Sequence, residues 1–370
     1  MRTIPVVLRA LLAVSIAAAR TPADEPARPR ALIEFGWDEP DTAFLRSHLA
    51  ALGRTPFDGC VFHVNALATD GKPASLTWGA WGRRAFADAE VKAARDDLRA
   101  LRPSRFTRNF LRFNATPGDV DWFDDFAPIV ANVRLAAGLA RDGRCAGVLF
   151  DVEAYQGALF DYPRQRDAKA KPWPAYADQA RRRGAEVMEA FQAGFPDVVV
   201  LLTFGHSLPW HQMARDGKGL AEVPYGLLAP FLDGMVAAAR GKARIVDGFE
   251  LSYGYKTPGQ FDAALATIRR GVLPIVADRE AYGRVVAPAF GIWLDYNWPK
   301  HGWDPADPSK NYFTPEAFES SVRAALARTD EFVWIYTEKP RWWTEAGGPT
   351  ALPEAYDAAL RRARRGAARD

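Results

Sequence analysis

The feature that most constrains this chain is a series of eight apolar runs of strand length, separated by segments with helical periodicity. Most of the runs are nearly continuous in apolar residues, which is typical of strands that are buried on both faces. Strands that alternate with helices indicate parallel βαβ units. The predicted strands are Ala31–Phe35, Cys60–Val64, Phe106–Phe113, Gly147–Val152, Val198–Phe204, Gly248–Tyr253, Phe290–Leu294 and Phe332–Tyr336.

The number of these units selects the fold class. Eight of them, without the Gly-x-Gly-x-x-Gly fingerprint of a doubly wound dinucleotide-binding sheet, favour an α/β fold of the closed (β/α)8, or TIM-barrel, type. Such barrels commonly exceed about 250 residues as one unit, so residues 31–370 are predicted to form a single domain. The predicted helical segments are Asp41–Leu52, Ala85–Leu101, Pro128–Arg141, Tyr176–Gly194, Pro258–Arg270 and Thr314–Arg328.

The first 30 residues have the layout of a secretory signal peptide followed by a linker. Arg2 opens a short basic region, and an apolar stretch from Ile4 to Ala19 ends in small residues before a segment rich in proline and charge. The stretch is too short to span a bilayer, and Arg9 interrupts it. We therefore expect a secreted or periplasmic protein without stable membrane insertion.

Composition excludes several functional classes. A net charge of +3 with scattered basic residues gives no support for nucleic-acid binding, and the basic tail Arg361–Arg365 suits the exposed end of a helix. Cys60 and Cys145 each open an apolar run and are predicted to be buried free thiols. The chain has five histidines and no His-x-His motif on the first strand, so neither a metal nor another cofactor is predicted.

Acidic side chains are concentrated where the predicted strands end. In a barrel, all the loops that follow the strands lie at one face, where active sites are built. Asp151 and Glu153 lie two apart at the end of the fourth strand, so both can point into the mouth of the barrel. Two close acids cannot both ionise at low cost, so the pKa of one should rise, which suits a general acid.

A second carboxylate follows the eighth strand. Glu338 lies beside Lys339 and Arg341, which could hold it ionised as a nucleophile or charge stabiliser. Asp38 and Glu39 could equally serve as the N-cap of the first helix. Further candidates are Glu34, Asp38, Glu39, Glu250 and Asp295. An acid at any one of these positions is more often structural than catalytic.

Tryptophan indicates the substrate class. Many of the 12 tryptophans fall in the predicted loops, and exposed indole faces stack on sugar rings while polar side chains bind hydroxyl groups. A single tryptophan in a loop is more often part of the core, but several at one face favour carbohydrate binding. The predicted substrate-binding residues are Trp37, Asp38, Asn65, Asn114, His206, Tyr253, Tyr255, Trp293, Asp295, Trp298 and Trp342.

Three motifs resemble the TIM-barrel glycoside hydrolase superfamily, and more narrowly a secreted bacterial branch of it. They are Phe-Gly-Trp-Asp-Glu-Pro at 35–40, Gly-Val-Leu-Phe-Asp-Val-Glu-Ala-Tyr at 147–155 and Trp-Ile-Tyr-Thr-Glu-Lys-Pro at 334–340. Asp151-x-Glu153 is similar to the Asp-x-Glu of chitinase-like enzymes. Those enzymes carry further aspartates upstream, whereas residues 147–150 of this chain contain none. Val152 before Glu153 also departs from the Asn-Glu of the large retaining clan.

The resemblance implies hydrolysis of an O-glycosidic bond in an oligo- or polysaccharide, with Glu153 as acid or acid/base and Glu338 as the second carboxylate. A separation of about 5–5.5 Å between them would give retention, and roughly 6.5–9.5 Å inversion. Two alternatives remain open from the residues alone. One is a barrel that binds carbohydrate without cleaving it, and the other is a metal-dependent hydrolase with an ion held by Asp38, Asp151 and Glu153.

Overall fold

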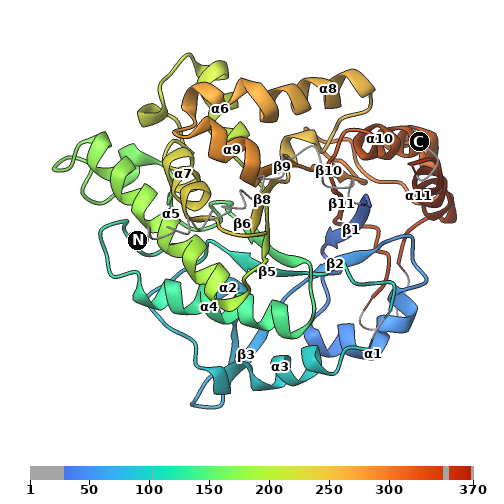
Figure 1. Cartoon of the computed structure of the whole chain (residues 1–370). Coiled ribbons are helices and arrows are strands. Elements are labelled where there is room, and N and C mark those ends of the chain that lie inside the picture. The colour runs from blue at the N-terminus through green and yellow to red at the C-terminus, as the bar shows by residue number, and fades with distance from the viewer. Residues whose placement is uncertain (1–28, 103, 345–349, 368–370) are drawn as a thin grey trace, which may run out of the picture.

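The computed structural model describes residues 29–102, 104–344 and 350–367 (Figure 1). The predicted signal peptide and linker, residues 1–30, therefore lie almost wholly outside the described residues. No helix within the described ranges is long and apolar enough to cross a membrane.

The core of the molecule is a ring of parallel strands, as the sequence predicts. The strand β9 pairs with β8, and β10 pairs with β11, while only Ala289 separates β9 from β10. These two short strands therefore occupy one position, and the pairing of β11 with β1 closes a ring of eight positions. In order around the ring the strands are β1 Ala31–Gly36, β2 Gly59–Phe62, β5 Phe110–Asn114, β6 Gly147–Asp151, β7 Val199–Leu202, β8 Arg244–Asp247, β9 Val286–Pro288, β10 Phe290–Trp293 and β11 Phe332–Thr337.

Helices surround this ring (Figure 1). Asp41 caps α1 by accepting a hydrogen bond from the Phe44 amide, so the predicted capping role falls to Asp41 and not to Asp38 or Glu39. A short antiparallel hairpin, β3 Asn65–Leu67 and β4 Pro73–Ser75, follows β2. The helices are α1 Thr42–Leu52, α2 Leu76–Gly79, α3 Lys92–Arg99, α4 Ala127–Asp142, α5 Trp173–Gly194, α6 Ser207–Asp216, α7 Leu228–Ala238, α8 Pro258–Ala266, α9 Arg279–Val285, α10 Pro315–Leu326 and α11 Glu354–Ala367.

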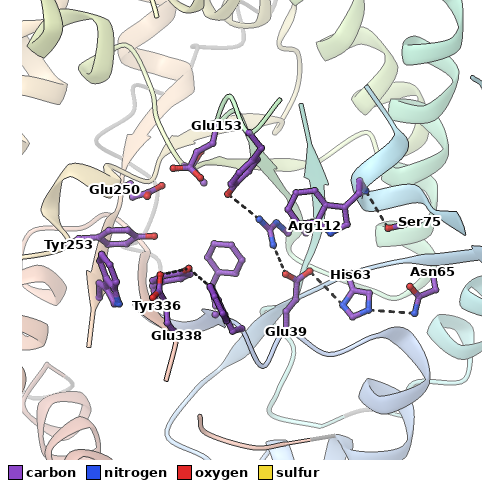
Figure 2. A pocket seen from close by; sticks show the side chains of 17 residues that line it. Glu39, His63, Asn65, Ser75, Arg112, Glu153, Glu250, Tyr253, Tyr336 and Glu338 are labelled. Carbon is purple, nitrogen blue, oxygen red and sulfur yellow. Dashed lines mark hydrogen bonds and ion pairs between the residues drawn. The ribbon is translucent and has the colours of Figure 1, made fainter. Parts of the chain in front are cut away.

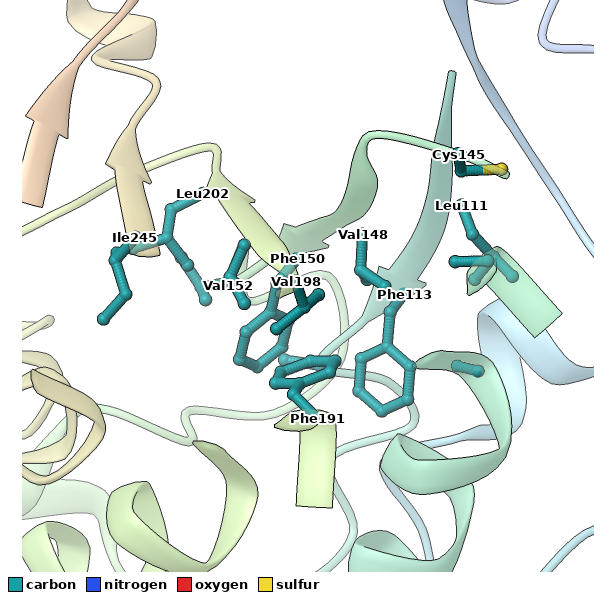
Figure 3. Packing of buried hydrophobic residues seen from close by; sticks show 14 of the residues in the cluster. Leu111, Phe113, Cys145, Val148, Phe150, Val152, Phe191, Val198, Leu202 and Ile245 are labelled. Atoms are coloured by element: carbon teal, nitrogen blue, oxygen red, sulfur yellow. The ribbon is translucent and has the colours of Figure 1, made fainter. Parts of the chain in front are cut away.

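Alternate residues of the strands fill two separate layers. Ile33, Phe110 and Leu149 belong to a buried cluster contributed by strands all around the ring, which fills its interior. Their neighbours in sequence face the helices, where Phe150 packs against Phe113 and Phe191 with ring centroids 5.5 and 6.0 Å apart (Figure 3). This two-sided burial explains why the strands are continuous apolar runs.

The sixth strand lies earlier than predicted. The sequence favours Gly248–Tyr253, but β8 ends at Asp247. Phe249 has a left-handed backbone with φ of 43°, which no strand can accommodate, and residues 250–252 form a 3₁₀ turn. Glu250 and Tyr253 therefore lie in the loop between β8 and α8, at the mouth of the barrel. The strand was missed because it is short and its two central apolar residues lie between polar residues.

The segment between β7 and β8 contains α6 and α7, and neither helix was predicted. The basic tail lies in α11, where Arg361 binds Asp357 and Arg362 binds Glu319. Cys60 and Cys145 are buried and free, as predicted.

The buried layer between the strands and the helices, part of which Figure 3 shows, should contribute strongly to stability. We expect Phe150→Ala to lower the free energy of unfolding by about 3–5 kcal/mol, because it removes a fully buried ring from between helices and strands. Denaturation in urea measures the change. Leu67→Ala is the control, since Leu67 is 58% exposed, and should change stability by less than about 0.5 kcal/mol. Equal effects of the two substitutions would contradict this description of the core.

Candidate active site

A cavity of about 840 Å³ opens at the carboxyl ends of the barrel strands (Figure 2). Parallel strands bring these ends, and the loops that follow them, to one face of the molecule. The residues around the cavity come from almost every strand end of the ring. They are Phe35, Gly36, Trp37, Glu39, His63, Asn65, Ser75, Trp78, Arg112, Glu153, Tyr155, Thr203, Glu250, Tyr253, Trp293, Tyr336 and Glu338.

Two carboxyl groups, those of Glu153 and Glu250, meet at one side of the cavity (Figure 2). Burial raises the pKa of Glu153, and the nearby charge of Asp151 raises it further. Burial also raises the pKa of Glu250 well above its usual range, and the charge of Glu153 adds to this effect. The two carboxyl groups interact directly, so the protonation of each depends on that of the other.

Asp151 lies beneath this pair and does not line the cavity. Its carboxylate is fully buried and accepts hydrogen bonds from Arg112 Nη2 at 2.8 Å and from the Tyr155 hydroxyl at 3.0 Å. It also accepts one from the backbone amide of Glu153, at 3.1 Å. Asp151 therefore positions Glu153 and supplies the negative charge that raises its pKa, in the direction that the sequence predicts.

Arg112 joins three strand ends at the floor of the cavity. Its guanidinium donates to Glu39 Oε2 at 2.8 Å and to Asp151 at 2.8 Å, and its Nε donates to Asn114 Oδ1 at 2.9 Å. The group also lies 4.8 Å from the centre of the Trp78 ring. Arg112 is almost completely buried, and its positive charge compensates the carboxylates of Glu39, at the edge of the cavity, and of Asp151, beneath it.

Glu338 reaches the cavity from beyond the end of β11 (Figure 2). The carboxylate of Asp295 accepts hydrogen bonds from the backbone amides of Glu338 and Lys339, at 3.0 and 2.9 Å, and thereby fixes this loop. Burial raises the pKa of Glu338, and the charge of Asp295 adds to the rise. The sequence suggested that Lys339 and Arg341 could hold Glu338 ionised. The charge of Lys339 does lower the pKa of Glu338, but burial and Asp295 raise it more, and Arg341 donates to the carbonyl of Trp37.

Aromatic side chains form much of the wall. Trp37 is 63% exposed, and its indole N–H donates to the Tyr336 hydroxyl at 2.9 Å. Tyr336 stacks on Tyr253 with ring centroids 5.4 Å apart, and Trp293 packs edge-on against both. Rings held in this way offer rigid apolar surface with hydroxyl groups at its edge.

The structure brings together part of the site predicted from the sequence. Six of the predicted residues line the cavity: Glu153, Glu338, Trp37, Asn65, Tyr253 and Trp293. The others do not line it: Asp38, Asp151, Asn114, His206, Tyr255, Asp295, Trp298 and Trp342.

The residues outside the cavity have identifiable contacts. His206 is buried against Asp233, with Nε2 and Oδ1 3.2 Å apart. Asn114 is occupied by Arg112, and Tyr255 packs edge-on against Phe261 in the outer core. Trp342 packs edge-on against Phe57, and its backbone amide donates to Asp38. Trp298 is exposed.

Several lining residues were not predicted. Glu39 and Glu250 were considered only as weaker candidates, and Arg112, Trp78 and Tyr155 were not assigned to the site. Arg112 had one available signal, because it lies two residues after Phe110 on β5 and so shares its inward face. Trp78 lies in the short helix α2, which follows the β3–β4 hairpin and was not predicted. The remaining unpredicted lining residues are Phe35, Gly36, His63, Ser75, Thr203 and Tyr336.

The three acids considered for a divalent ion do not converge. Asp151 is bound to Arg112, and Asp38 accepts a hydrogen bond from the backbone of Trp342. Among the described residues, no group of three or more histidine, cysteine, aspartate or glutamate side chains is arranged to hold a metal ion.

No protein-family model matches this sequence, and no curated protein matches it significantly. Among solved structures, it is similar to the glycoside hydrolase GH5_18 from Streptomyces cattleya in complex with GlcNAc, at 12% identity, a TM-score of 0.48, and coverage of 92% of this chain and 81% of that one. It is similar to the family 5 glycoside hydrolase PbGH5A from Prevotella bryantii, at 9% identity and a TM-score of 0.46, over 89% and 88% of the two chains. A third is an endocellulase from Pyrococcus horikoshii, at 10% identity and a TM-score of 0.44, over 90% and 92%.

A further carboxyl group, that of Glu34 on β1, is fully buried and does not line the cavity. Burial, and then the charge of Asp38, raises the pKa of Glu34 well above its usual range. In the folded protein Glu34 therefore keeps its proton to higher pH. In the unfolded chain it loses the proton at the ordinary glutamate pKa of about 4.3. The stability that comes from burying the neutral acid is present below that pH and is lost as pH rises through the raised pKa.

We expect Glu34→Gln to flatten the fall in stability with rising pH, because an amide cannot ionise. Urea denaturation between pH 5 and pH 8 measures the slope for both proteins. Glu280→Gln is the matched control, since the Glu280 side chain is 88% exposed and loses little hydration on folding. A parallel pH dependence in wild type and Glu34→Gln would show that Glu34 is ionised throughout this range.

Proposed function

We propose that this chain is a glycoside hydrolase that cleaves an O-glycosidic bond of an oligo- or polysaccharide. The observation that carries the proposal is the arrangement of three carboxyl groups, those of Glu153, Glu250 and Glu338, around one aromatic-walled cavity (Figure 2). Hydrolysis of a glycosidic bond needs one carboxyl group that gives a proton and a second that stabilises or attacks the sugar.

The pair formed by Glu153 and Glu250 supplies the proton. We assign Glu153 as the general acid, since Glu250 is the more deeply buried of the two. The proton passes from this pair to the oxygen that leaves as the glycosidic bond breaks. Glu250 keeps the pair protonated toward neutral pH, because a second negative charge beside Glu153 is unfavourable. Beneath the pair, Asp151 accepts a hydrogen bond from the backbone of Glu153, and Arg112 compensates the charge of Asp151.

Glu338 is the second carboxylate. In its ionised form it either attacks the anomeric carbon directly or removes a proton from the attacking water, and the products in both cases are the two sugars with one water added. Asp295 fixes the Glu338 backbone, so the side chain projects from a rigid point. The chemistry requires no cofactor.

The aromatic residues support a carbohydrate as substrate. Trp37, Trp293 and Trp78 line the cavity, and C–H faces of sugar rings stack on indole surface. The polar groups between them, including Asn65 and His63, are placed to bind hydroxyl groups.

The test is hydrolysis of a panel of glycans and aryl glycosides by wild type, Glu153→Gln and Glu338→Gln. We expect each substitution to lower kcat by roughly 10³-fold or more on a polysaccharide substrate, because each removes a carboxyl group that acts only in the transition state. Glu280→Gln, on the exposed surface of α9, is the matched control. EDTA should have no effect.

Two outcomes would contradict the proposal. Glycan binding by wild type and both variants without turnover would leave a barrel that binds carbohydrate and does not cleave it. Turnover that survives both substitutions but disappears with EDTA would indicate a metal-dependent hydrolase.

The shared proton gives a separate prediction about pH. In Glu250→Gln only one carboxyl group of the pair can still ionise, and no second charge opposes its ionisation, so this group should lose its proton at lower pH than the pair does. The alkaline limb of the kcat/KM profile should therefore move to lower pH, while the acidic limb, which follows Glu338, should not move. An alkaline limb that stays in place would show that Glu250 does not control this proton.

A further inference from the structure

The loop after β6 is held by side chains along its first three residues. The chain carries Glu153 from the end of β6 to the cavity without regular secondary structure. Each of the three successive backbone amides donates to a side-chain oxygen: Val152 to Thr203 Oγ1 at 3.3 Å, Glu153 to Asp151 Oδ1 at 3.1 Å, and Ala154 to the Tyr225 hydroxyl at 3.0 Å. The position of Glu153 therefore depends on these acceptors.

One of the acceptors, Thr203, lies directly after β7 and departs from the pattern of a parallel sheet. Its backbone amide donates to the carbonyl of Phe150 at 3.4 Å, which continues the ladder between β6 and β7. The next bond of such a ladder would join the Val152 amide to the Thr203 carbonyl. Here the Thr203 hydroxyl accepts that amide, and the carbonyl accepts the amide of Glu250 at 3.2 Å. Thr203 thus holds the backbone beside both carboxyl groups of the pair.

The chain after β8 is brought to Thr203 by Asp247. The fully buried carboxylate of Asp247 accepts hydrogen bonds from the amides of Gly205, at 3.1 Å, and Phe249, at 3.0 Å. The second bond stabilises the left-handed backbone of Phe249, which turns the chain so that the amide of Glu250 meets the Thr203 carbonyl. A Cβ atom on Gly205 would lie only 2.2 Å from the Asp247 carboxylate, so the approach of the two loops requires glycine there.

From these contacts we infer that Thr203 is a positioning residue, which fixes the separation between the carboxyl groups of Glu153 and Glu250. The inference rests on the proposed hydrolase activity and adds a residue to it. Thr203 lies at the wall of the cavity but is almost completely buried, so it acts through the two backbones and not on the sugar. At a fixed short separation each carboxyl group opposes the ionisation of the other, and the proposed acid keeps its proton toward neutral pH.

Other groups also act on the protonation of this pair. The charged and titratable residues around it are Asp151, Arg112, Tyr155, Tyr225, Tyr253 and Tyr336. A substitution at Thr203 removes none of these groups. The effect of the separation between Glu153 and Glu250 can therefore be isolated by comparing the substitution in wild type with the same substitution in Glu250→Gln, where the pair no longer exists.

The test is Thr203→Val, which keeps the shape of the side chain and removes the acceptor of the Val152 amide. We expect kcat on the best substrate of the glycan panel to fall by about tenfold or more, because the acid is displaced, while KM changes by less than about twofold. The alkaline limb of the kcat/KM profile should move to lower pH by about 0.5 unit or more, because the two carboxyl groups oppose each other less. In Glu250→Gln the same substitution should leave the alkaline limb in place.

Two further variants control for the loss of a buried hydroxyl. Thr203→Ser keeps the acceptor and should restore both kcat and the pH profile. Thr329→Val is the matched control, since the buried Thr329 hydroxyl donates to the carbonyls of Pro288 and Phe332 at the amino end of β11, away from the cavity. It should leave the pH profile unchanged. Thermal denaturation confirms that each variant is folded, and Thr203→Ala replaces Thr203→Val if the latter does not fold.

A titration that needs no substrate separates this inference from the proposed function. NMR of protein labelled with ¹³C at the glutamate carboxyl groups, with signals assigned from Glu153→Gln and Glu250→Gln, should show the pair losing its proton at lower pH in Thr203→Val. An unchanged titration and alkaline limb would overturn the role of Thr203 and leave the hydrolase in place, and so would an equal shift in the Glu250→Gln background. No turnover of any glycan by wild type would overturn the proposed hydrolase, while the titration would still decide whether Thr203 positions the pair.

Discussion

The paired contact of Arg112 with Glu39 and Asp151 is the interaction on which the rest of the site depends. It connects the loop after β1, the strand β5 and the end of β6 at one point beneath the cavity. Removing a buried ion from such a pair leaves the other charges without compensation, which costs several kcal/mol. The same contact fixes Asp151, whose free oxygen then holds the backbone of Glu153. The position of the candidate acid thus follows from a buried salt bridge two residues away.

Most of the fold could be predicted from the sequence because barrel strands are buried on both faces. Seven of the eight strand positions appear as apolar runs, including β1 and β11, which the structure places side by side. The exception is β8, a short strand that ends before Gly248 and the left-handed Phe249, where the sequence favoured a strand. A backbone angle of this kind leaves no trace in hydrophobic periodicity.

The site could be predicted only where it follows strand ends. Glu153 and Glu338 lie just beyond β6 and β11, so a count along the strands finds them. The contact between Glu153 and Glu250 joins residues almost a hundred positions apart, and the sequence contains no sign of it. His206 and Asp295 also follow strands, but their side chains turn to Asp233 and to the backbone of the last loop. The direction in which a side chain points after a strand end depends on tertiary contacts, which the local sequence pattern does not reveal.

The role of Asp295 has a consequence for how this barrel can change over time. Asp295 holds the amides of residues 338 and 339, and makes no demand on the side chain that position 338 carries. The backbone of this loop and the side chain that it presents to the cavity are therefore specified by different residues. A mutation at 338 would replace that side chain while the backbone contacts of Asp295 stay intact, so the lining of the cavity can change there without the loss of stability that usually accompanies such a change.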